Sequence, residues 1–281
     1  PASAINLTPL LNKLGAEDAS GVTLDIRITP VADDATQREV AQALKASGGE
    51  AVVPAMQFEV VARFGDEEAA VSRFPNYVTR TVALTAEQAA QVSTAVVVDA
   101  NGKTRHIPTK LSQKDDEHFA EINSLTNSTY VLISGEASFP DIAGKWYEAY
   151  AQEMGNRKIV EGYDDGTFSG DSSITRAEFA QILVNALGLP SDGDGTVFSD
   201  VSADAWYAGA VGTAYEHGLV SGRGDGVFDP QASITRQEAM IMIRNAAKIA
   251  AYQGQSGSLD GFSDAAQVAS WAEDAVKFCV G

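Results

Sequence analysis

Apolar and polar positions alternate with a period of two through the first half of the chain. The alternation is clearest in three runs: Val22–Ile28, Phe58–Ala62 and Val96–Val98. A period of two puts every second side chain on one face of a strand, so these runs predict strands with one buried face. The Asn-Gly pair between Asp99 and Lys103 predicts a hairpin turn, because both of its residues tolerate positive φ. Together these patterns predict an antiparallel β domain that ends near Gly135.

One helix is expected within this β domain. Thr36 is a candidate N-terminal cap, and Val40 and Leu44 lie about one turn apart on the same helix face. Gly48 and Gly49 supply a typical helix end, because glycine adopts the left-handed conformation there without strain.

Beyond Gly135 the apolar period becomes that of a helix. From Phe179 to Leu187 apolar residues fall at positions i, i+3, i+4, i+7 and i+8, which predicts one apolar stripe facing a core. An earlier helix is expected to begin near the first of three residues that share a face: Trp146, Tyr150 and Met154. Polar, glycine-rich segments at 189–196 and 253–258 predict linkers between such helix pairs.

A set of motifs occurs twice in this second half. The matching segments are 139–141 with 198–200, 162–168 with 222–228, and 174–179 with 234–239. A third copy opens with Phe262–Asp264 and Trp271, and the sequence stops before its second half. Repeats of this length bury their apolar faces against one another, so we expect one assembly. We also expect the sequence to continue beyond Gly281, or another segment or a second chain to complete the third copy.

These motifs resemble the S-layer homology module of bacterial surface proteins, with two full modules at 139–189 and 198–250 and half of a third. The upstream chain is similar to a β-rich domain often found before such modules, through three segments: Arg73–Arg80, His106–Thr109 and Asn123–Tyr130. The resemblance implies an α+β multidomain fold, in which helix–loop–helix repeats form a pseudo-threefold bundle with protruding prongs. The expected domains are a β-rich spacer at 1–135, repeats at 136–190 and 195–252, and a half repeat at 260–281.

The resemblance also implies a role and a location. The expected role is non-covalent anchoring of an extracellular S-layer or wall protein of a Gram-positive bacterium to secondary cell-wall polysaccharide, commonly a pyruvylated one. The expected glycan-binding residues are Arg176, Arg236, Trp146, Trp206, Asp141, Asp200, Gly162 and Gly222. The alternative is a lattice or filament subunit whose repeats make protein contacts. Anchoring and self-association can coexist, and the sequence does not separate them.

The repeated Thr-Arg-x-Glu motif carries both structural and binding chemistry. Thr175 with Glu178, and Thr235 with Glu238, fit the capping box of a helix start. An arginine in the first turn opposes the helix dipole, so its presence in both copies invites a functional explanation. Helix-start amides and a planar guanidinium suit a carboxylate, such as that of a pyruvyl ketal. The residues alone leave this open against a simple ion pair with Asp171 or Glu178, and the resemblance favours binding.

Structural readings compete with binding at the other candidates. A tryptophan at the start of an amphipathic helix more often anchors a core than stacks on a sugar, so Trp146, Trp206 and Trp271 are expected to be mostly buried. Asp141 and Asp200 are expected to cap the segments that follow them, with contact to ligand hydroxyls as a second role.

Composition narrows the partners. The chain carries 20 basic against 38 acidic residues, a net charge of −18, which repels nucleic acid and anionic lipid. No apolar run approaches the ~20 residues of a membrane span, so no membrane insertion is expected. The lone Cys279 is expected to be a small buried residue on a helix.

Enzymatic and metal-binding chemistry is not expected. His106, His118 and His217 lack metal-ligand spacing, and no nucleophile-elbow motif occurs. The stretch 192–195 resembles part of a calcium loop, but it lacks the third acidic ligand and the closing glutamate, so a flexible linker is expected. We therefore expect neither a metal nor an organic cofactor.

Overall fold

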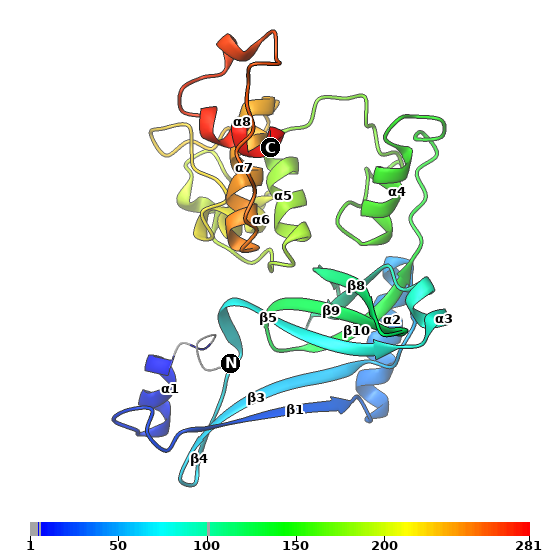
Figure 1. Ribbon diagram of the computed structural model, residues 1–281, viewed down its shortest axis with the longest axis vertical. Helices are drawn as coiled ribbons and strands as arrows, with labels where there is room; N and C mark the ends of the chain where they lie inside the picture. The colour runs from blue at the N-terminus through cyan, green and yellow to red at the C-terminus, as the bar shows by residue number, and fades with distance from the viewer. Residues whose placement is uncertain (1–4, 6, 100–101) are drawn as a thin grey trace. The chain divides into compact units, whose positions relative to one another are not determined.

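The computed structural model describes residue 5 and residues 7–99 and 102–281. The chain forms two compact units, Pro1–Phe168 and Ser169–Gly281 (Figure 1). The division falls inside the first repeat, so the two halves of that repeat belong to different units.

Two antiparallel sheets build the first unit, as the alternating runs predicted. The larger sheet has the order β1-β3-β10-β6-β7, with β2 paired to β10 and β4 paired to β3. Its strands are β1 (Thr23–Pro30), β2 (Gly49–Ala51), β3 (Met56–Phe64), β4 (Glu67–Ala70), β6 (Thr94–Val98), β7 (Thr104–Ile107) and β10 (Thr129–Gly135). The smaller sheet, of order β5-β9-β8, contains β5 (Arg73–Leu84), β8 (Thr109–Lys114) and β9 (Glu117–Thr126).

Alternation sorts the side chains of β6 and β10 between two cores. Val96 and Val131 pack with Val40 and Leu44 of helix α2 (Asp34–Ser47). Residues on the opposite face of the same strands join the second sheet in a larger core, which includes Val97, Tyr130, Leu132, Ala120 and Ile122. Strands β6 and β10 are therefore covered on both faces, which explains why their sequences are almost continuously apolar.

The helices of the first unit refine two sequence expectations. They are α1 (Leu7–Leu14), α2, α3 (Ala86–Gln91) and α4 (Glu148–Asn156). The cap of α2 is Asp33 and not Thr36, because the Asp33 carboxylate accepts a hydrogen bond from the Thr36 amide at 2.8 Å. Gly48 ends α2 with φ of 65°, as expected. The predicted hairpin joins the paired strands β6 and β7, although Asn101 lies outside the described residues.

Two of the three segments that resemble the β-rich domain, 73–80 and 123–130, contact each other around Arg80. Its guanidinium donates to the carbonyl oxygen of Thr126 at 2.9 Å and to Oδ1 of Asn127 at 2.7 Å. The same group lies 5.1 Å from the ring centroid of Tyr130 and 5.6 Å from that of Phe58. Burial lowers the pKa of Arg80, and the surrounding carbonyls and aromatic rings stabilise the charge in place of an acid.

Helix α4 buries a different face from the one predicted. Tyr150 is 67% exposed, while Tyr147, Ala151 and Gly155 are buried. The reason is close packing at Gly155, where an added Cβ would lie 2.8 Å from the Phe139 ring. The small residues Ala151 and Gly155 therefore determine which face of α4 is buried. The large residues of the predicted face, Tyr150 and Met154, each lie one position before them.

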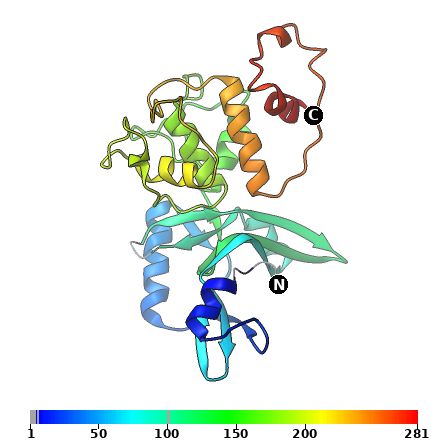
Figure 2. The same ribbon diagram turned by 90° about the vertical axis from the view of Figure 1, so that its left-hand side faces the viewer.

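Four helices and two short 3-10 turns make up the second unit. They are α5 (Arg176–Ala186), α6 (Ala208–Glu216), α7 (Arg236–Ile249) and α8 (Glu273–Val280), with η2 (Gly195–Val197) and η3 (Ala265–Gln267). Helix α5 contacts α6 and α7, and α7 contacts α8; Figure 2 shows the long excursion of the chain between α7 and α8. Cys279 lies half-buried on α8, where burial raises the pKa of its thiol.

The apolar stripe of α5 also differs from the prediction. The fully buried face consists of Ala177, Ala180 and Val184, whereas Phe179 and Ile182 are only partly buried. Small side chains again permit the close approach of a neighbouring helix.

The segment 189–196 is packed against α6, so the expectation of a flexible linker was wrong. The Gly193 amide donates to Oγ1 of Thr213 at 3.0 Å, and that hydroxyl donates to the Pro190 carbonyl at 2.7 Å. A Cβ on Gly193 would lie 2.1 Å from the Thr213 nitrogen, so only glycine allows this contact. Among the described residues, no helix is long and apolar enough to cross a bilayer.

Candidate functional site

The start of α5 is joined to the second repeat. The amides of Arg176 and Ala177 donate to the carbonyls of Ala232 and Pro230, at 2.9 and 3.1 Å. Thr175 also forms an isolated β-bridge with Ser233. The first two helix amides, which were candidates for binding an anion, therefore have acceptors from the protein itself.

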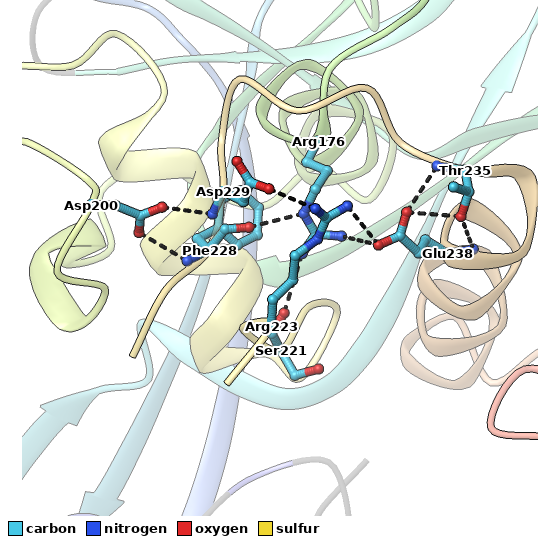
Figure 3. Close-up of polar contacts among 8 residues, drawn as sticks. All are labelled: Arg176, Asp200, Ser221, Arg223, Phe228, Asp229, Thr235 and Glu238. Atoms are coloured by element: carbon cyan, nitrogen blue, oxygen red, sulfur yellow. Dashed lines mark hydrogen bonds and ion pairs between the residues drawn. The ribbon is translucent and has the colours of Figure 1, made fainter. Parts of the chain in front are cut away.

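The Arg176 side chain lies at this contact between the start of α5 and the second repeat, called the Arg176 junction from here on. It is only 5% exposed. Its Nε donates to the Phe228 carbonyl at 2.9 Å, and its Nη2 lies 3.4 Å from the Ser221 carbonyl. Its Nη1 donates to Oε1 of Glu238 at 3.2 Å (Figure 3). The guanidinium carbon lies 4.8 Å from the centroid of the Phe228 ring. Burial lowers the pKa of Arg176, although the guanidinium stays charged at any physiological pH.

Glu238 holds this junction together from the start of α7. Its Oε2 accepts from the Thr235 amide at 2.9 Å, and the Glu238 amide donates back to the Thr235 hydroxyl, so the capping box is formed. Its Oε1 accepts from both Arg176 and Arg223. Burial alone would raise the pKa of Glu238, but the hydrogen bonds from Thr235 and Arg223 outweigh it, and the pKa lies below its ordinary value. The equivalent box of Thr175 and Glu178 is also formed.

Arg223 is a member of the junction that the sequence analysis missed as a site residue. Its Nη2 donates to Glu238 at 2.9 Å and its Nη1 to Asp229 at 2.6 Å, while the side chain stays 37% exposed. The first repeat has Tyr163 at the equivalent position. An arginine at a position where the first repeat has a tyrosine was the feature of the sequence that could have pointed to Arg223.

The predicted aspartates and glycines shape the loops of the repeats. Asp200 accepts from the amides of Phe228 and Asp229, at 2.8 and 2.7 Å, so it fixes a distant loop instead of capping α6. Burial opposes ionisation of Asp200, but these amides keep its pKa below the ordinary value. In the first repeat Asp141 makes the matching bond to the Phe168 amide, at 2.9 Å.

Gly162 and Gly222 occupy equivalent close contacts within these loops. A Cβ would lie 2.7 Å from the Thr167 carbonyl oxygen in the first repeat and 2.6 Å from that of Val227 in the second. The glycines therefore serve backbone packing directly. The structure brings Gly222 and Asp200 to the same loop as the Arg176 junction, while Asp141 and Gly162 belong to the first unit.

The tryptophan rings are not core anchors, which corrects the expectation of burial. Trp146, Trp206 and Trp271 are 83%, 64% and 60% exposed. The residue after each tryptophan enters the core instead: Tyr147, Tyr207 and Ala272. Trp206 stands edge-to-face on Tyr207, with ring centroids 5.2 Å apart. The repeats therefore present flat aromatic surfaces to solvent.

Arg236 differs from its equivalent Arg176. Its side chain is exposed, and no carboxylate of the described residues lies within ion-pair distance of it. Within the described chain, the amides of Arg236 and Gln237 have no backbone acceptor beyond the helix, unlike those of Arg176 and Ala177. The start of α7 is open, and the start of α5 is filled.

Comparison with known proteins identifies the repeats. The model of the S-layer homology domain family matches residues 138–180 and 197–240. The chain is 34% identical over 160 residues to a surface-layer 125 kDa protein of Lysinibacillus sphaericus, covering 56% of this chain and 13% of that protein. It is 40% identical over 89 residues to a surface layer protein of Brevibacillus choshinensis, covering 30% of this chain and 8% of that protein.

Another relative bears the name of an enzyme. The chain is 29% identical over 184 residues to an exoglucanase of Acetivibrio thermocellus, covering 63% of this chain and 17% of that protein. The chain thus spans less than a fifth of the length of these curated relatives. Residues 138–180 and 197–240 therefore match the S-layer homology domain, and the likeness to surface-layer proteins indicates an extracellular location at the cell wall or surface layer.

Proposed function

We propose that the repeats anchor the protein non-covalently to secondary cell-wall polysaccharide, with the β domain as a spacer. The observation that supports this role most directly is the open start of α7. Among the described residues, the amides of Arg236 and Gln237 have no backbone acceptor beyond the helix, and the exposed Arg236 has no carboxylate within ion-pair distance. Such a helix start favours a carboxylate, which the helix dipole also attracts. A pyruvylated sugar carries such a group.

The Arg176 junction has a different part in this proposal. It gathers two guanidinium groups and three carboxylates, those of Asp200, Asp229 and Glu238. This balance disfavours a further anion. Arg176 fixes the loop of the second repeat, and the exposed side of Arg223 with Asp200 and Gly222 contacts sugar hydroxyls.

The exposed rings offer a further proposed contact with sugar in each unit separately. Sugars present apolar C–H faces that pack on aromatic rings, and Trp146 and Trp206 offer such rings at equivalent positions of the two repeats. Asp141 and Gly162 shape the loop of the first repeat as Asp200 and Gly222 shape that of the second. We assign no catalytic step to the chain, and the pseudo-threefold bundle of three modules remains part of the proposal.

Binding to cell-wall sacculi tests the function. The chain should pellet with sacculi that retain their secondary polymer and stay in solution with sacculi stripped of it. Equal pelleting with both preparations would refute the anchoring role. Calorimetric titration with a pyruvylated disaccharide and its depyruvylated form tests the carboxylate; equal affinity would refute that part alone.

Contact between copies of the protein in a surface layer is a second candidate function. The observation that favours it is strand β1 at an edge of the larger sheet, where the apolar Ile26 is 63% exposed.

A further inference from the structure

Strand β1 is an edge strand of the larger sheet. In the described part of the chain it pairs with β3 and with no other strand, along the whole length from Thr23 to Pro30 (Figure 1). Ile26 and Ile28 are 63% and 58% exposed. Edge strands of this kind can pair with a strand of another chain, and natural proteins usually shield them.

The exposed isoleucines continue an apolar face. Ile26 lies opposite Val60 and Ile28 lies opposite Phe58 in the β1–β3 register. Residues directly opposite one another on antiparallel strands share a face, and Phe58 on that face is only 5% exposed. The side chains of a further strand paired with β1 would pack beside both isoleucines and reduce their exposure.

We infer that β1 pairs with β1 of a second copy, antiparallel, with the two Ile26 residues opposite each other. This register places Asp25 of each copy opposite Arg27 of the other, and Leu24 opposite Ile28. Opposite charges then meet on one face and apolar residues on the other, so the strand is self-complementary. A two-fold axis at Ile26 generates every contact twice, as a closed dimer requires.

Other registers lose this match. A shift of the axis by one residue puts Arg27 opposite Arg27, or Asp25 opposite Asp25, and like charges directly opposite are destabilising. Pairing Ile26 directly opposite Arg27 or Asp25 puts the apolar face of one copy beside the polar face of the other. The sequence of β1 therefore specifies the register.

The existing ion pairs leave room for the new ones. Asp25 is held by Arg63, whose Nε lies 2.6 Å from Oδ2. Among the described residues, the carboxylates within ion-pair distance of Arg27 are those of Asp25, at 3.9 Å, and Glu68, at 4.0 Å, both near the limit of that distance. Its guanidinium can therefore take a closer carboxylate from a second copy. The net charge of −18 opposes association at low salt, but at ~0.15 M ionic strength charges beyond ~8 Å are largely screened.

Disulfide trapping tests the register. Residues opposite on antiparallel strands have Cα separations of about 4.5–5.5 Å, within the range of a disulfide. In a Cys279→Ser background, Ile26→Cys should therefore give a covalent dimer under mild oxidation. Ile28→Cys is the matched control, because the two copies of residue 28 would be about 14 Å apart at ~3.4 Å per residue. Equal trapping of both variants, or of neither, would overturn the inference.

Charge reversal tests the pairing without any cross-link. Arg27→Asp alone and Asp25→Arg alone each create like-charge pairs in the dimer, so each should raise the dissociation constant roughly tenfold or more. An equimolar mixture restores opposite charges at every position and should associate again in sedimentation velocity. Leu111→Lys, on the separate strand β8, is the control and should leave association unchanged. A chain that stays monomeric would refute the proposal. Asp25 and Arg27 would then serve only to protect the edge strand from pairing.

Discussion

Arg176 and Glu238 come from two copies of one motif and bind each other at 3.2 Å. Arg176 is the arginine of the first Thr-Arg-x-Glu segment, and Glu238 is the glutamate of the second. Their side chains are 6% and 17% exposed, so the pair is largely shielded from water. The motif that begins each helix thereby also joins one repeat to the next.

Removing Arg176 should destabilise the second unit while removing Arg236 should not. Arg176→Ala removes the ion pair with Glu238 and leaves the Phe228 carbonyl without its side-chain donor, which should cost about 1–3 kcal/mol, although Glu238 keeps Arg223 and Thr235. Arg236→Ala removes an exposed side chain and should change stability by less than about 0.5 kcal/mol. Hydrogen exchange at the amides of α5 and α7 measures both effects, and equal loss of protection in the two variants would contradict the structure.

Arg236 should matter for glycan binding. If it holds a carboxylate, Arg236→Ala removes a charge-assisted hydrogen bond and should weaken binding by ~1.5–3 kcal/mol. Arg244→Ala is a matched control, because it removes the same charge from the same helix. Calorimetric titration with the pyruvylated disaccharide decides; similar losses in both variants would indicate a general charge effect instead of a site.

The junction should open in acid. Glu238 and Asp200 have pKa values below their ordinary 4.5 and 3.8 in the folded chain. Groups of this kind contribute stability that is fully present above the ordinary pKa and is lost as the pH falls through the folded pKa. Protection of α5 and α7 against hydrogen exchange, corrected for intrinsic rates, should therefore hold above pH 4.5 and decline below it. Glu238→Gln should reduce this dependence, and an unchanged profile would show that Glu238 is not responsible.

His106 should make the β domain sensitive to acid over a higher pH range. Burial, with the nearby charges of Arg157 and Arg105, lowers its pKa to about 3, and its Nδ1 lies 2.8 Å from the Thr94 hydroxyl. Its ordinary pKa is 6.5, so between pH 6.5 and 3 the unfolded chain binds a proton that the folded chain does not. Stability should fall with decreasing pH by about 1.4 kcal/mol per unit in that window. Thermal unfolding of His106→Asn should lack this slope.

The local parts of the fold were predictable from the sequence. The strands followed from alternation at Val22–Ile28 and Val96–Val98, and the end of α2 followed from Gly48. Helix faces were predicted less well, because Trp146 and Tyr147 are adjacent and apolar, and periodicity does not say which one enters the core. Close packing at Gly155 decides it, and that contact depends on Phe139, which is distant in sequence.

The candidate site was only partly predictable for a related reason. Spacing alone predicts a capping box, since Thr235 and Glu238 lie three residues apart. The partners of Arg176 are more than 40 residues away, at Ser221, Phe228 and Glu238. Such contacts depend on how repeats are joined, which no local pattern encodes.

The filled start of α5 and the open start of α7 make the contact between repeats heterologous. One repeat offers a helix start and the next offers a loop, so the two sides of the contact are different surfaces. Contacts of this type either close into a ring or propagate without limit, depending on the rotation between successive units. In a ring every helix start is filled by a neighbour, whereas an open series always leaves one helix start free. The number of helix starts available to a ligand therefore depends on whether the series of repeats closes, and not on how many repeats it contains.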